Sequence, residues 1–272
     1  MPVGRIEDVR PDDLVVLATM GHDSAATVAS LPPDMPLVSF QNGLAPFETL
    51  SSARTGPAGG PARALIAAML YVPAERRAPG VVVLAGSPAP GAVFLGQWPS
   101  GILGPEEWLA DALRKAGFRA EVFSNIAPWI RAKALANLGG IYAALCDQPP
   151  MDVVEATVEE ARACFRAEGV EVIADEVFDA RIGPMELVDV DGLPRVGGST
   201  RHALARGDRL ETESLHGYFV RLGERVGVPT PLNAALVALA ERATEERWSA
   251  GALSAEELRR WLYAPASGSA AG

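Results

Sequence analysis

Pro36-Leu-Val-Ser-Phe-Gln-Asn-Gly43 is a short apolar run that ends directly in two amides and a glycine. A second run of the same kind, Leu14-Val-Val-Leu-Ala18, follows a turn that is rich in Pro and Asp. Short continuous apolar runs are typical of strands that are buried on both faces, as in a parallel sheet. We therefore predict two parallel strands, with Gln41 and Asn42 just beyond the carboxyl end of the second.

Working outward from these runs, strand-like and helix-like stretches alternate as far as residue 125. We predict further strands at 64–72, 81–84, 92–95 and 119–123, and helices at 22–31, 45–53 and 105–116. The strands at 81–84 and 92–95 flank a Gly/Pro turn, which predicts a β-hairpin. Strands that alternate with helices predict an α/β fold with a doubly wound, Rossmann-like sheet.

The pattern changes after Ser124, where the remaining chain becomes helical. We predict helices at 126–145, 153–169, 170–178, 211–226 and 233–243, and a short helix that starts at Ser199. The last residues are small and polar, which is typical of a disordered tail. The sequence thus predicts an α/β domain at 1–125, an all-helical domain at 126–263 and a disordered tail at 264–272.

Composition limits the classes of partner. The 272 residues include 24 Lys and Arg against 34 Asp and Glu, a formal net charge of −10. Nucleic acids and anionic membranes attract basic surfaces, so we expect neither as a partner. The chain also has no apolar run long enough to span a bilayer and no signal-peptide pattern at its start. Cys146 and Cys164 lie in apolar, helix-like contexts, which is typical of buried thiols in a cytoplasmic protein.

The first segment that could carry chemistry is Ser39-Phe-Gln-Asn-Gly43. In open α/β sheets ligands bind beyond the carboxyl ends of the strands, so an amide at that place can reach a cofactor or substrate. Asn-Gly is also a strong turn dipeptide, so a plain turn is the alternative interpretation.

The second segment lies on the predicted helix at 126–145. Trp129, Lys133 and Asn137 are spaced four residues apart and share one helical face. Because the rest of the helix is apolar, Lys133 either extends its amine to the surface or lies in a cleft, where burial lowers its pKa and favours proton transfer. Gly139-Gly140 weakens the helix, which predicts the close approach of a neighbouring backbone or a ligand.

The third segment begins at Gly197-Gly-Ser-Thr200 and ends at Glu211. A Gly-Gly-Ser-Thr start followed by a short helix is typical of an anion-binding helix N-terminus. The alternative makes Ser199 a simple N-cap and Glu211 a partner of the next helix dipole.

Taken together and in this order, the three segments resemble the 2-dehydropantoate 2-reductase (ketopantoate reductase) family. The resemblance runs from about Asp13 to Leu239 and is tightest between Ser199 and Asn233. Its motifs are Gln41-Asn42-Gly43 after a strand, Lys133-x-x-x-Asn137, Ser199-Thr200 with Glu211 twelve residues further on, and Gly227-Val-Pro-Thr-Pro-x-Asn233.

The resemblance implies the NADPH-dependent reduction of a 2-oxo acid to a 2-hydroxy acid, as in the conversion of ketopantoate to pantoate for pantothenate biosynthesis. It implies a truncated NADP-binding domain at 1–125, a substrate-binding and dimerisation domain at 126–263, and a homodimer as a candidate assembly. The implied catalytic residues are Lys133, as the general acid, and Glu211, which binds the hydroxyl group and positions Lys133. The implied binding residues are Asn137, Ser199 and Asn42 for the substrate, and Asn42 and Gln41 for the cofactor, with no metal.

The chain departs from the family pattern at three places. It contains no G-x-G-x-x-G, the turn that receives the pyrophosphate, and Leu14–Ala18 resembles a strand from well inside the family's sheet. Met20 stands where the family commonly has Lys, and Gly140 and Ile141 stand where it commonly has a second Asn. Two alternatives therefore stay open: a binding or dimerising protein that has lost the cofactor, and a dehydrogenase for a different 2-oxo acid. We also expect the first strand to expose an unpaired edge, so that the chain either aggregates or relies on a partner to cover that edge.

Overall fold

The computed structural model describes residues 8–10, 13–32, 35–52, 64–190 and 198–263. Two compact units make up the chain: Met1–Ala134 with Glu171–Arg195, and Leu135–Val170 with Val196–Gly272. The predicted domain boundary between residues 125 and 126 remains a prediction. The predicted tail at 264–272 lies outside the described residues.

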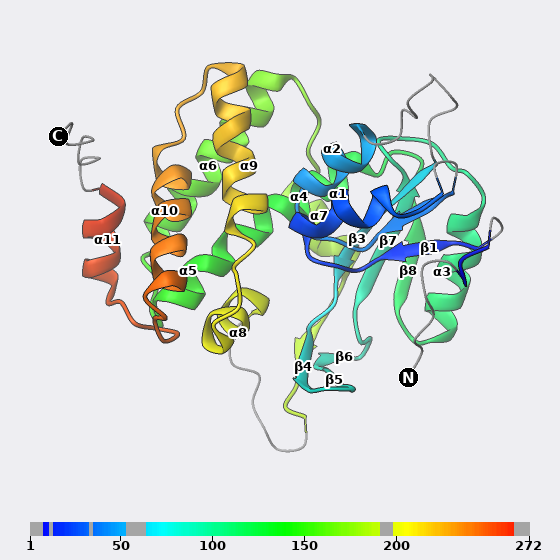
Figure 1. The fold of residues 1–272 in the computed structure, drawn as a ribbon, viewed down its shortest axis with the longest axis horizontal. Helices are drawn as coiled ribbons and strands as arrows, with labels where there is room; N and C mark the ends of the chain where they lie inside the picture. The colour runs from blue at the N-terminus through cyan, green and yellow to red at the C-terminus, as the bar shows by residue number, and fades with distance from the viewer. Residues whose placement is uncertain (1–7, 11–12, 33–34, 53–63, 191–197, 264–272) are drawn as a thin grey trace. The chain divides into compact units, whose positions relative to one another are not determined.

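The first unit is built on a five-stranded sheet with the order β1-β2-β3-β7-β8 (Figure 1). The apolar runs that open the sequence analysis form β1 and β2, which pair in parallel, and β2 in turn pairs in parallel with β3. The predicted α/β fold class is therefore confirmed, and β1 is an edge strand of this sheet. The strands are β1 (Val15–Leu17), β2 (Leu37–Ser39), β3 (Leu65–Tyr71), β7 (Ala92–Gln97) and β8 (Arg119–Val122).

One strand of this sheet runs against its neighbour. β7 pairs antiparallel to β3 and parallel to β8. Between β3 and β7 the chain forms short ribbon strands and no crossover helix, so it returns beside β3 in the opposite direction. The predicted hairpin between 81–84 and 92–95 is therefore wrong, because β5 (Val81–Leu84) pairs with β4 (Ala74–Ala78). β6 (Gly86–Ser87) pairs with β9 (Glu186–Leu187).

Helices pack against the sheet of the first unit. They are α1 (Ser24–Ala29), preceded by a 3-10 turn at Gly21–Asp23, α2 (Ala45–Ser52), α3 (Pro105–Lys115) and α7 (Asp175–Ile182). Figure 1 shows α3 beside β8, and Ala110 of α3 packs on Val38, Ile66 and Val93 of the strands. The predicted helix at 170–178 is wrong at its start, since residues 170–174 are not helical.

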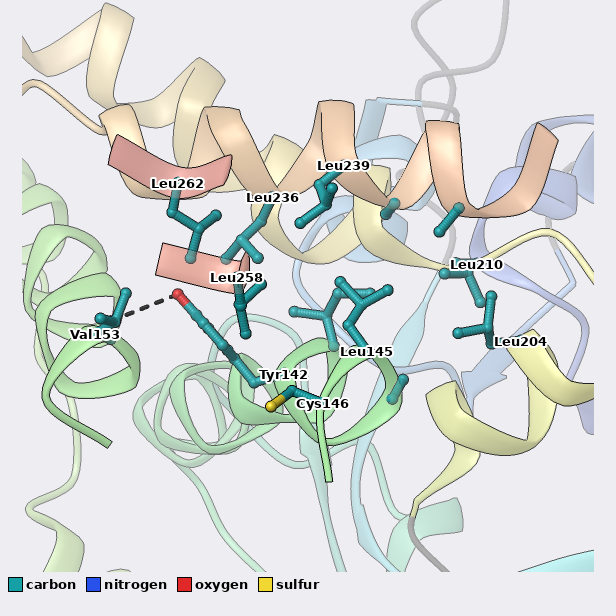
Figure 2. Close-up of a cluster of buried hydrophobic side chains, with 14 of the residues drawn as sticks. Tyr142, Leu145, Cys146, Val153, Leu204, Leu210, Leu236, Leu239, Leu258 and Leu262 are labelled. Atoms are coloured by element: carbon teal, nitrogen blue, oxygen red, sulfur yellow. Dashed lines mark hydrogen bonds between the residues drawn. The ribbon is translucent and has the colours of Figure 1, made fainter. Parts of the chain in front are cut away.

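The second unit is helical. It contains α5 (Gly139–Leu145), α6 (Met151–Glu168), α8 (Ser199–Arg206), α9 (Thr212–Val226), α10 (Pro231–Glu245) and α11 (Ala255–Tyr263). Its core consists of leucines from several helices around the fully buried Tyr142, as Figure 2 shows. Leu258 and Leu262 of α11 complete this core. Cys146 and Cys164 are both buried free thiols, as predicted.

The predicted helix at 126–145 is two helices. α4 (Ala127–Asn137) ends before Leu138, and α5 begins at Gly139. A Cβ atom on Gly140 would lie 3.1 Å from Oγ1 of Thr200 in α8, so the missing side chain lets α8 approach. A close approach does occur at Gly140, but the approaching group is a side chain and not the predicted backbone or ligand.

Candidate functional site

Gln41 joins the ends of two parallel strands in the first unit. Its side chain is buried, and its Nε2 donates to the carbonyl oxygens of Thr19, at 2.9 Å, and Met20, at 3.3 Å. Its Oε1 accepts from the hydroxyl groups of Ser24, at 3.1 Å, and Ser39, at 3.3 Å. The Gln41 amide thus bonds within the protein and fixes the loop after β1 against the loop after β2.

Asn42, the next residue, differs from Gln41 in its bonding. Its side chain is partly buried and makes no hydrogen bond with the residues that the structure describes. Gly43 follows with φ of 81°, a left-handed conformation that glycine adopts without strain, and turns the chain into α2. The predicted placement just beyond the carboxyl end of a parallel strand is confirmed.

Lys133 lies on α4, one turn after an aromatic anchor. The ring of Trp129 packs on Phe94, Phe123 and Phe178, with centroid distances of 5.2, 4.6 and 6.3 Å. These contacts hold the preceding turn of α4 in the first unit. Burial lowers the pKa of Lys133 from 10.5 to about 8, and in the described part of the chain no carboxylate pairs with its amine.

Tyr71 is the neighbour of Lys133 that the sequence analysis missed. The Nζ atom of Lys133 lies over the Tyr71 ring, 4.7 Å from its centroid. Tyr71 ends β3, and β3 is parallel to β2, whose end leads into Asn42. The Lys133 amine thus lies at the carboxyl end of β3, and the Asn42 amide follows the carboxyl end of β2; β3 extends four residues beyond Ala67, the residue that pairs with Ser39 of β2. Open α/β sheets bind ligands beyond the carboxyl ends of their strands.

Three predicted residues belong to the second unit. Asn137 is the last residue of α4, and its side chain makes no hydrogen bond with the described residues. Ser199 is exposed and is the first residue of α8, whose N-cap is Gly198, so the interpretation of Ser199 as an N-cap is wrong. Glu211 occupies the N-cap position of α9, and its carbonyl accepts from the backbone N–H groups of Ser214 and Leu215. Glu211 starts the long helix, as predicted.

The second unit also holds a buried polar network that the sequence analysis missed. The Asn233 side chain is fully buried; its Nδ2 donates to the carbonyl of Thr157 and to Glu160, and its Oδ1 lies 2.9 Å from Nδ1 of His216. Glu160 also accepts from the backbone N–H of Leu232 at the start of α10. The network therefore ties α6, α9 and α10 together.

His216 is the buried ionisable group of this network. Burial lowers its pKa from 6.5 to about 4, although hydrogen bonds to Asn233 and to the backbone of Leu138 act in the opposite direction. The imidazole is therefore neutral at neutral pH. Its position among packed helices makes it a structural group.

Metal sites and membrane spans were the remaining features considered in the described residues. Among the described residues, His, Cys, Asp and Glu side chains form no group of three or more that could hold a metal ion. The helices of the described part are also too short or too polar for a membrane span.

Known proteins match this chain over its C-terminal part and over most of its length. The family description "Ketopantoate reductase PanE/ApbA C terminal" matches residues 132–244. A 2-dehydropantoate 2-reductase of Archaeoglobus fulgidus is 30% identical over 170 residues, which span 59% of this chain and about half, 54%, of that relative. A 2-dehydropantoate 2-reductase of Caulobacter vibrioides is 28% identical over 251 residues, or 86% of this chain and 78% of the relative.

Solved structures extend the match. A PanE/ApbA family ketopantoate reductase from Ralstonia eutropha superposes with a TM-score of 0.65 at 27% identity, over 86% of this chain and 76% of that one. Two others, both under 25% identical, show the fold alone. They are D-mandelate dehydrogenase with NADH and anilino(oxo)acetate (TM-score 0.68, 21% identity, 92% and 82% covered) and a dimeric ketopantoate reductase from Staphylococcus aureus (0.60, 16%, 89% and 81%).

These matches first define a class, the oxidoreductases that join a parallel-rich α/β sheet to a helical C-terminal region. Within that class, residues 132–244 match the C-terminal model of the ketopantoate reductase family, and the chain is similar to ketopantoate reductases over most of its length.

Proposed function

We propose that the chain reduces a 2-oxo acid to a 2-hydroxy acid with a nicotinamide cofactor, and that ketopantoate and NADPH are the natural pair. Its relatives are named for this activity. The observation that carries the proposal is Lys133: an amine with a pKa of about 8, without a carboxylate partner in the described residues, at the carboxyl edge of a parallel sheet.

The described residues fit one end of such a cofactor. The Asn42 side chain has an acceptor and two donors that bond to none of the described residues, which suits the carboxamide of a nicotinamide. Gln41, whose amide is fully engaged, then acts by holding Asn42 in place. The 272 residues contain no G-x-G-x-x-G, so we assign no residue to the pyrophosphate.

The chemistry follows from the lysine. A bound reduced nicotinamide supplies a hydride to the carbonyl carbon of the substrate. Negative charge then develops on the carbonyl oxygen, and the Lys133 ammonium stabilises this charge and donates a proton to it. With a pKa of about 8, Lys133 is mostly protonated at neutral pH and is a stronger acid than an ordinary lysine. We therefore expect turnover in the reductive direction to fall above about pH 8.

The second unit supplies the remaining assigned roles. We assign the substrate carboxylate to Ser199 at the start of α8, where a hydroxyl and unpaired backbone N–H groups favour an anion. Asn137 orients the substrate, and Glu211 binds its hydroxyl group and positions Lys133. A homodimer is the proposed assembly, supported by the dimeric Staphylococcus aureus neighbour.

The test is a reductase assay on the purified chain, followed by the absorbance of the reduced cofactor. NADPH and NADH are each combined with ketopantoate and with an aryl 2-oxo acid, because one structural neighbour is a mandelate dehydrogenase. Faster turnover of ketopantoate with NADPH is the expected result. Preference for the aryl acid would instead favour a different 2-oxo acid, as the departure at Gly140 and Ile141 suggests. No change in nicotinamide fluorescence on mixing would favour the non-catalytic alternative.

A further inference from the structure

Tyr71 stands on a rigid part of the first unit. It is the last residue of β3 and pairs with Ala92 at one end of the β3–β7 ladder. On the β7 side, a Cβ atom on Gly91 would lie 2.9 Å from the Tyr71 carbonyl oxygen, so the two backbones pass at close range. Tyr71 as a whole is 37% exposed. Its backbone is thus fixed by the strand pairing.

An aromatic ring suits the task of holding a proton-donating amine. The negative face of the ring attracts an ammonium group, and the contact uses no acceptor that would take the proton. A carboxylate in the same place would favour the charged form and raise the lysine pKa. Burial lowers the pKa of Lys133 to about 8. The amine has this lowered pKa although its Nζ lies 4.7 Å from the centroid of the Tyr71 ring.

The lysine also needs such a support. Its side chain has four rotatable bonds, and fixing them costs conformational entropy. No hydrogen bond or ion pair to the described residues fixes the Lys133 amine. The Tyr71 ring is the contact that the structure provides.

We propose that Tyr71 is a positioning residue for Lys133: its ring face holds the ammonium group at the carboxyl edge of β3, ready to donate a proton. The contact itself is independent of the reaction, whereas its catalytic value rests on the proposed function. Two experiments separate these parts.

The first experiment observes the contact directly. The chain has only two lysines, Lys115 and Lys133, so reductive ¹³C-methylation labels these two and the α-amino group. Lys115 is exposed, and a Lys115→Arg variant assigns its signal. We expect the Lys133 methyl signal to lie upfield through the ring current of Tyr71. Tyr71→Phe should keep that shift, and Tyr71→Ile, which suits a strand, should abolish it. An unchanged signal in Tyr71→Ile would overturn the proposal.

The second experiment measures catalysis. The strength of a cation–π contact corresponds to a roughly two- to thirtyfold change, and we expect kcat to fall by this factor in Tyr71→Ile. The KM for the nicotinamide cofactor should stay the same, and Tyr71→Phe should restore kcat. Tyr263→Ile, in α11 of the second unit, is the matched control. Equal loss in Tyr71→Phe and Tyr71→Ile would contradict a role for the ring face. If the wild type reduces no 2-oxo acid but the NMR shift behaves as expected, the proposed function fails and the contact stands.

Discussion

Asn42 and Asn233 are both asparagines, but their side-chain amides differ in burial and in hydrogen bonding. Asn233 is fully buried in the second unit, and both ends of its amide bond to protein groups on two other helices. Asn42 is partly buried at a strand end of the first unit, and its amide bonds to none of the described residues. The first amide stabilises a fold, and the second is available to a ligand.

The same contrast separates the two buried bases. His216 is hydrogen-bonded among helices and has a pKa of about 4, so it stays neutral. Lys133 rests on a ring, has a pKa of about 8, and can change its protonation state at moderate pH. His216 and Asn233 thus bond to each other within the second unit, whereas Asn42 and Lys133 make no hydrogen bond with the described residues. We expect the function to lie with the second pair.

The largest expected effect is on turnover. Lys133→Met removes the proposed acid and should lower kcat by about 10²- to 10⁴-fold, the usual contribution of general acid catalysis. The folded state should remain intact, as circular dichroism would show. Lys115→Met, at the exposed end of α3, is the control and should leave kcat unchanged. A Lys133→Met variant with wild-type turnover would refute the assignment.

The second largest expected effect is on the free energy of unfolding. Asn233→Ala removes the side-chain bonds from Asn233 to Glu160, to the Thr157 carbonyl and to His216, and should lower the free energy of unfolding by about 3 kcal/mol. Asn42→Ala should change it by less than about 0.5 kcal/mol while lowering turnover. Urea denaturation of both variants measures the difference. Equal destabilisation would remove the distinction between the two asparagines.

The next effect depends on pH. The pKa of His216 is about 4 in the folded chain and 6.5 in an unfolded one, so the unfolded chain binds the proton more readily between these values. The free energy of unfolding should be unaffected above pH 6.5 and should fall as the pH drops toward 4, by at most about 3 kcal/mol. His216→Gln should lose less stability than the wild type between pH 7 and pH 4.5. Parallel curves for the two proteins would contradict this.

The smallest effect concerns Gln41. Gln41→Met removes hydrogen bonds to Thr19, Met20 and Ser24, and should cost about 1–2 kcal/mol of stability. If Gln41 acts by holding Asn42 in place, the lost hydrogen bonds should raise the KM for the cofactor. The kcat should change little. A kcat loss as large as that of Lys133→Met would instead place Gln41 among the catalytic groups.

Local patterns predicted much of the fold. The apolar runs at 14–18 and 36–40 became β1 and β2, and the periodic stretches at 153–169, 211–226 and 233–243 became α6, α9 and α10. The direction of β7 could not be predicted this way, because it depends on the path of the chain between β3 and β7. The missed helix α11 had a signal: Ser254 and Glu257 form a capping box, with bonds from the Ser254 N–H to Glu257 and from the Glu257 N–H to Ser254.

The sequence predicted only part of the candidate site, because local features can be predicted and contacts between distant residues cannot. Asn42 follows β2 as expected, since a strand end and a turn are local features. The Tyr71–Lys133 contact joins residues far apart in the chain, and a tyrosine at a strand end is common in sequences. The bond between His216 and Asn233 likewise joins two helices. Such pairings arise from packing, and one sequence carries no local sign of them.

The scarcity of lysine has a consequence for proteolysis. A lysine-specific endoprotease has only two peptide bonds to cleave in this chain, one after Lys115 and one after Lys133. The first lies at an exposed helix end, and the second lies inside α4. Cleavage inside a helix requires local opening, so the ratio of the two cleavage rates reports the free energy of opening α4. Cleavage after Lys133 thus measures the local stability of the helix that holds the proposed proton donor.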